Sequence, residues 1–122
     1  MFSAKKGVIG AIITILILTI LEFPAPIGFE TRPQGNVSLF WLLFFLTILI
    51  TEIATIPLIF KRPKLSASFG LIAAVLNILQ VIADQLHLMQ PEIAPLGYTL
   101  LEYAVGVVAL FLIYFSLKVH KD

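Results

Sequence analysis

Four long apolar runs dominate the sequence. They cover Gly7–Phe23, Val37–Phe60, Leu65–Leu88 and Ile93–Leu117. Most of them are close to the ~20 residues that an α-helix needs to cross ~30 Å of hydrocarbon. With 60% hydrophobic and 12% charged residues, the chain has too little polar surface to cover a small soluble domain. The sequence therefore predicts an all-α integral membrane protein, with the lipid bilayer as its solvent.

The connections between the runs indicate a single antiparallel four-helix bundle, spanning residues 1–122, with helices at about 7–23, 37–60, 65–88 and 96–117. The KRPK turn at Lys61–Lys64 is short, so neighbouring helices are expected to be antiparallel. The first run follows Lys5 and Lys6, as in a secretory signal peptide. We expect it to be retained, because the following EFPAPIGFE has no small-x-small site directly after the apolar run.

The basic residues predict the orientation of the bundle. Cytoplasmic loops of membrane proteins are enriched in Lys and Arg. In an up-and-down bundle one side collects Lys5, Lys6, Lys61, Arg62, Lys64, Lys118 and Lys121, and the other collects Arg32, Glu22, Glu30, Asp84 and Glu92. We therefore expect a multi-pass protein of the cell membrane with both termini cytoplasmic.

Composition argues against several kinds of cofactor and partner. The chain has no cysteine, which removes disulfides, thiolate metal sites and iron–sulfur clusters. Its two histidines, His87 and His120, lie at a helix end and in the C-terminal tail, so we expect no haem. No Gly-rich phosphate loop or basic stripe supports binding to nucleic acid. We expect no cofactor and no metal site.

A stripe of small and polar residues follows one face of the third helix. Its members are spaced alternately by four and three residues: Ser66, Gly70, Ala73, Asn77, Gln80, Asp84 and His87. A 3.5-residue repeat is typical of the seam between paired helices, and in membranes such seams consist of small residues and of polar residues that bond across them. We expect Ser66, Gly70 and Ala73 to form a packing seam facing the other helices, and Val75 and Ile82 to face lipid.

The polar members of the stripe have two readings. Asn77 and Gln80 are either interhelical hydrogen-bonding groups or ligand contacts. Asp84 and His87 either reach water at the membrane interface, where His87 suits the negative end of a helix dipole, or share one layer with Glu22 and with Glu102 of the fourth helix. Such a layer could bind a divalent cation or exchange protons.

Glu52 lies deep in the second run, with no Lys or Arg at the same depth. A lone carboxylate there is costly, so we expect it to be protonated or paired with a group outside the chain. Asn77 approaches a similar level on the third helix, which predicts a hydrogen-bonded Glu52–Asn77 contact. A role for Glu52 as a proton or cation carrier is the alternative.

The stretch TEIATIPLIFKRPKLSASFGLIAAVLNILQVIAD, Thr51–Asp84, resembles the central hairpin of DoxX-like membrane proteins. It has a glutamate in one helix, an apolar run, a short basic turn and a helix rich in small residues, over about a third of the chain. The resemblance implies a small accessory subunit of quinone-linked or thiol-stress redox systems, with Glu52 matching the family glutamate. It does not imply catalysis.

Three functions fit these observations. The first is a non-catalytic accessory subunit that binds an apolar or quinone-like ligand or a membrane protein partner. The second is a small proton-coupled transporter of a cation or lipophilic compound, similar to the small multidrug resistance transporters in length and helix number. The third is a purely structural or assembly subunit. The possible protein partners are another membrane protein or further copies of this chain in a homo-oligomer. The candidate ligand- or proton-binding residues are Glu52, Asn77, Gln80, Asp84, His87 and Glu102.

Overall fold

The computed structural model describes residues 3–23, 28, 38–88 and 96–121. Within these ranges it contains four helices: α1 (Ala4–Leu21), α2 (Leu39–Lys61), α3 (Pro63–Gln85) and α4 (Leu96–Lys121). Each of them is long and apolar enough to cross a membrane. The predicted all-α fold with four apolar helices is therefore confirmed.

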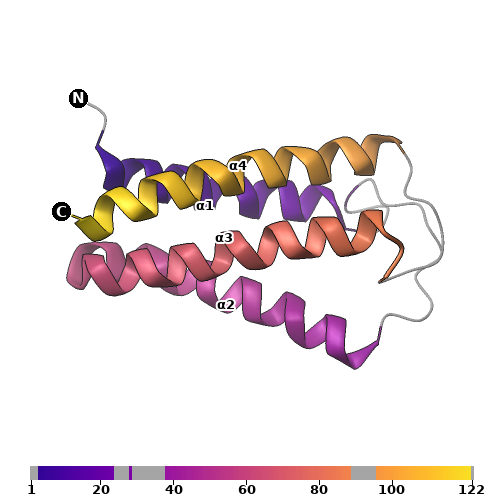
Figure 1. Cartoon of the computed structure of the whole chain (residues 1–122), viewed down its shortest axis with the longest axis horizontal. Helices are drawn as coiled ribbons and strands as arrows, with labels where there is room; N and C mark the ends of the chain where they lie inside the picture. The colour runs from indigo at the N-terminus through magenta and orange to yellow at the C-terminus, as the bar shows by residue number, and fades with distance from the viewer. Residues whose placement is uncertain (1–2, 24–27, 29–37, 89–95, 122) are drawn as a thin grey trace.

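The helices run alternately in opposite directions, and both termini lie at the same end of the bundle (Figure 1). The α2–α3 connection is also at this end and consists of Arg62 alone, as expected for a tight turn. We call it the basic end, because it holds Lys5, Lys6, Lys61, Arg62, Lys64, Lys118 and Lys121. The opposite end, where α1 and α3 terminate near Glu22 and Asp84, is the acidic end.

Local chemistry explains where the helices differ from their predicted bounds. Ser3 accepts a hydrogen bond from the backbone of Lys6, so α1 begins at Ala4 rather than at residue 7. Ser38 caps α2 in the same way. Basic residues occupy the last turn of α4, where positive charge stabilises the negative end of the helix dipole. α4 therefore continues to Lys121, beyond its predicted end. The predicted loop between the first two helices lies outside the described residues except for Gly28.

The predicted end of the third helix at Leu88 is wrong. α3 ends at Gln85, and His87 adopts a left-handed conformation with φ 60°. The His87 and Leu88 amides donate to the carbonyls of Asp84 and Ala83, at 3.0 and 2.9 Å. These two bonds form a Schellman motif, which closes a helix C-terminus and turns the chain away.

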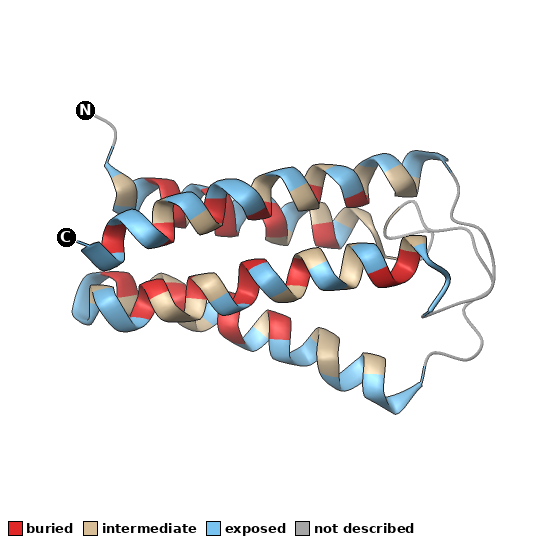
Figure 2. Cartoon of the chain, viewed as in Figure 1, coloured by how far each residue is buried: buried red, intermediate tan, exposed pale blue. Residues whose placement is uncertain are grey.

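The bundle core lies between α1, α3 and α4 and along the basic half of α2. α3 packs extensively against both α2 and α4, and α1 packs mainly against α4. Buried positions face inward along each helix (Figure 2). At Gly70 the approach of α4 is so close that an added Cβ would lie 2.6 Å from Ser116 Oγ. The small residues of α3 therefore set the spacing of the bundle.

The acidic half of α2 departs from this packing. All buried residues of α2 lie at or beyond Ile48, and the segment Leu39–Thr47 diverges from the other helices (Figure 1). Within the described helices, α2 touches α1 only slightly and does not approach α4. The bundle is consequently closed at the basic end and open at the acidic end.

Candidate functional site

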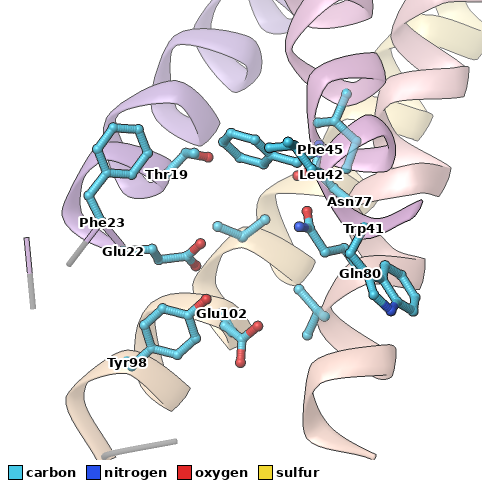
Figure 3. Close-up of a pocket in the computed structure, with 13 residues that line it drawn as sticks. Thr19, Glu22, Phe23, Trp41, Leu42, Phe45, Asn77, Gln80, Tyr98 and Glu102 are labelled. Atoms are coloured by element: carbon cyan, nitrogen blue, oxygen red, sulfur yellow. The ribbon is translucent and has the colours of Figure 1, made fainter. Parts of the chain in front are cut away.

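A cavity of about 410 Å³ lies at the acidic end, between the diverging half of α2 and the other three helices (Figure 3). Its volume is within the range of about 300–1,000 Å³ that is usual for small-molecule sites. One wall is aromatic and aliphatic, and the other carries the polar groups. The lining residues are Thr19, Glu22, Phe23, Trp41, Leu42, Phe45, Ile48, Asn77, Gln80, Val81, Tyr98, Glu102 and Val105.

The predicted seam of α3 leads directly to this cavity. Ser66, Gly70, Ala73, Asn77 and Asp84 are buried, and Gln80 is half-buried. Ser66 Oγ donates to the carbonyl of Thr55 at 2.7 Å, which joins α3 to α2. Val75 and Ile82 are exposed, as expected for lipid-facing positions. The stripe from Ser66 to Asp84 therefore lies on the inward-facing side of α3.

His87 does not belong to the seam. It follows the end of α3 and its side chain is exposed, which agrees with the reading in which it reaches interfacial water. The prediction from the 3.5-residue repeat required α3 to continue through His87, but the left-handed turn there ends the helix. The same reading is wrong for Asp84, which is only 3% exposed.

Glu52 and Asn77 form the predicted contact between α2 and α3. Asn77 Nδ2 donates to Glu52 Oε1 at 3.1 Å and to the carbonyl oxygen of Ala73 at 2.9 Å. Glu52 is fully buried, and its Oε2 atom has no hydrogen-bond partner among the described residues. Both N–H groups of Asn77 are used, so its amide orientation is fixed and its carbonyl oxygen is left over.

The structure brings together three carboxyl groups from three helices. Glu102 accepts a hydrogen bond from Gln85 Nε2 at 2.7 Å. It also interacts with Asp84, and Glu22 lies near enough to act on it electrostatically. The predicted layer of carboxyl groups therefore exists, without the imidazole of His87. Among the described residues, no group of three or more His, Cys, Asp or Glu side chains is arranged to hold a metal ion.

Two of the carboxyl groups lie at helix C-termini, in a region where α1 and α3 end and α2 and α4 begin (Figure 1). Glu22 is the C-cap of α1 and Asp84 lies in the last turn of α3. At these two helix ends the dipole disfavours negative charge on the acidic side chains. The lining contains no Lys or Arg, and Arg32 lies outside the described residues. A positively charged or hydrogen-bond-donating group is the natural complement of this wall.

Sequence reasoning missed several members of the site. Gln85, which donates a hydrogen bond to Glu102, was not singled out. A glutamine in the last turn of an apolar helix could have indicated a polar contact with a neighbouring helix. Thr19 and Phe23 line the cavity from α1 and its end. Trp41, Phe45 and Tyr98 add aromatic rings to the lining. Their common position depends on the divergence of α2, which the sequence does not show.

No family model, no curated protein and no solved structure matches this chain. The described residues form a small four-helix protein with long apolar helices and an amphipathic cavity at its acidic end.

Proposed function

We propose that the chain is a multi-pass protein of the cell membrane, with both termini cytoplasmic, that binds a small organic ligand in the cavity without catalysing its conversion. The observation that carries the proposal is the cavity itself, which combines aromatic walls with a few convergent polar groups. Such a combination is the usual form of a small-molecule site. The lining offers carboxyl, amide and hydroxyl groups without a nucleophile–base–orienter set.

The resemblance to DoxX-like proteins supports an accessory role beside a larger membrane complex. In that role an apolar or quinone-like ligand would occupy the cavity, and the exposed apolar surfaces of the helices would contact lipid or a membrane protein partner.

A second candidate function is proton-coupled transport of a cation or lipophilic compound. It is favoured by the carboxyl groups of Glu22 and Glu102, which line the cavity. It is also favoured by Glu52, which is buried in α2 and bonded to a cavity residue. Buried carboxyl groups in membrane helices commonly mark ion and proton pathways.

Binding is testable through Trp41, because it is the single tryptophan of the chain and it lines the cavity. In ¹⁵N-labelled protein in lipid nanodiscs, its indole resonance should shift on titration with a short-chain quinone or an aromatic amine. Val105→Phe should reduce the shift, because Val105 is 3% exposed and lines the cavity. The matched control on the same helix is Val107→Phe. Val107 is 52% exposed, so this variant should leave the shift of the Trp41 resonance intact.

Either of two results would overturn ligand binding in the cavity. The first is that no probe moves the Trp41 resonance. The second is that Val105→Phe and Val107→Phe bind every probe equally well. Co-purification of a larger redox complex would favour the accessory role, and proton-coupled uptake of a lipophilic cation by proteoliposomes would favour transport.

Orientation is testable by single cysteines, because the chain has none of its own. A cysteine at Asn36 should react with a membrane-impermeant label added outside intact cells, and one at Lys64 should not. Labelling of position 64 alone would reverse the proposed orientation.

A further inference from the structure

Two of the polar residues that line the cavity, Asn77 and Thr19, can offer a ligand only hydrogen-bond acceptors. Asn77 is 4% exposed, and its two N–H groups are taken by Glu52 and by the Ala73 carbonyl. Only its carbonyl oxygen remains for a ligand. Thr19 donates its hydroxyl proton to the carbonyl of Ile15 at 2.8 Å, so its oxygen too can only accept.

The carboxyl groups extend this acceptor character. Glu22 from α1 and Glu102 from α4 point into the same space, and Gln80 from α3 faces them (Figure 3). One oxygen of Glu102 is engaged by Gln85. Asp84 interacts with Glu102 as a third acidic neighbour. Carboxylates gathered in a region of low dielectric repel one another unless a cation or protons neutralise them.

The opposite wall is suited to an apolar body. Trp41 and Phe45 come from the diverging half of α2 and lie across the cavity from the two glutamates (Figure 3). Aromatic faces attract cations as well as apolar groups. A quinone presents only acceptors, so it would rely on Trp41, Gln80 and Tyr98 for hydrogen bonds, whereas Asn77 and Thr19 would offer it only oxygens.

We propose that the cavity binds an amphipathic amine: a protonated primary or secondary amine on an aromatic or aliphatic body. The ammonium donates to Glu22, Glu102 and the Asn77 carbonyl oxygen, and the body packs against Trp41 and Phe45. Glu52 is a positioning residue, because it holds the Asn77 amide with its carbonyl oxygen turned to the ligand. This inference rests on the proposed function, since it specifies the ligand of the same cavity.

Four probes of similar size separate the alternatives. They are 4-phenylbutylamine, 4-phenylbutanol, trimethyl(4-phenylbutyl)ammonium and a short-chain quinone, each titrated into nanodiscs at pH 7 and followed by the Trp41 indole resonance. The nanodiscs contain only zwitterionic lipid, so that an amine is not concentrated by lipid charge. We expect the amine to bind about tenfold or more tightly than the alcohol, because charged hydrogen bonds are the stronger ones. The quaternary cation, which has no N–H donor, should bind more weakly than the amine.

Two charge-removing variants test the carboxyl groups. Glu102→Gln should weaken binding of the amine about tenfold and leave binding of the alcohol unchanged. Glu102→Gln also changes the hydrogen bond that Gln85 donates to Glu102. A second variant, Glu22→Gln, therefore tests the other carboxyl group, which belongs to a half-buried helix cap. Glu52→Gln should preserve binding, since a glutamine oxygen still accepts from Asn77. Glu52→Ala should weaken binding of the amine more than binding of the alcohol.

The outcomes distinguish this inference from the proposed function. If all four probes shift Trp41 and the alcohol or the quinone binds as tightly as the amine, the amine assignment is overturned and ligand binding stands. Equal binding of the primary and quaternary amines would contradict the donor requirement. If neither Glu22→Gln nor Glu102→Gln changes the preference for the amine, the two carboxyl groups are not its receptors. If no probe moves Trp41, the proposed function itself fails.

Discussion

The basic and acidic ends of the bundle are built from the same four helices and pack in opposite ways. At the basic end, small residues of α3 allow α4 to approach until Gly70 has no room for a Cβ beside Ser116. At the acidic end, the large aromatic residues of α2 have no buried neighbour on their own helix before Ile48, and a cavity replaces the core. Polar groups gather at the open end, where they face a space that a ligand can fill.

The two halves of the α3 stripe serve two purposes. From Ser66 to Ala73 the α3 stripe consists of residues whose small size provides close contact. From Asn77 to Asp84 the same stripe carries amides and a carboxyl group. Stability should therefore depend on the basic half, and ligand binding on the acidic half.

Truncation of a core side chain should give the largest difference in stability between the two halves of the bundle. Ile59 is fully buried at the basic end, whereas Leu42 of the same helix is 49% exposed and lines the cavity. We expect Ile59→Ala to cost about 2 kcal/mol, at the low end for core truncations, because lipid rather than water surrounds the separated helices. Leu42→Ala should be nearly neutral. Thermal unfolding in detergent measures both, and a larger loss for Leu42→Ala would remove the distinction between the ends.

Overpacking of the seam should have the next largest effect. Gly70→Leu should lower the unfolding free energy by about 1–3 kcal/mol, because its side chain would collide with Ser116 and Leu112. Val75→Leu on the lipid-facing side is the control and should be mild, since Val75 is 47% exposed. Equal melting temperatures for the two variants would contradict the seam.

Variants of Glu52, which lies at the boundary between the halves, should show whether its role is structural. Glu52→Ala should cost about 1–2 kcal/mol, because it abandons the Asn77 amide in a buried position. Glu52→Gln should fold with almost unchanged stability. An infrared carboxyl band that disappears in Glu52→Gln would report the protonation of the native side chain. Equal stability of Ala and Gln variants would show that the Asn77 bond contributes nothing.

The smallest effect is expected at His87, outside the core. Its left-handed φ of 60° favours glycine, so His87→Gly should raise the unfolding free energy by about 0.5–1 kcal/mol. His87→Ala keeps the Cβ and should not be stabilising. A loss of stability in His87→Gly would indicate that the imidazole makes a contact of its own.

Much of the fold could be predicted from the sequence, because it depends on local hydropathy. The four apolar runs became helices, and the seam and the Glu52–Asn77 contact followed from a repeat and from equal depth. The end of α3 could not be predicted, because a histidine in a left-handed turn has no composition signal as clear as glycine. The burial of Asp84 was likewise missed, since it depends on how α4 lies beside it.

Four helices, their alternating direction and the segregation of basic and acidic residues to opposite ends follow from the sequence alone. Hydropathy, turn length and charge order are properties of the chain. Three features depend instead on the tertiary structure: the divergence of α2 before Ile48 (Figure 1), the hydrogen bond from Gln85 to Glu102 and the position of Asn77 beside the cavity. These features depend on the register and spacing of helices distant in sequence. Register and spacing are set by side-chain volumes across the bundle, which no single helix encodes.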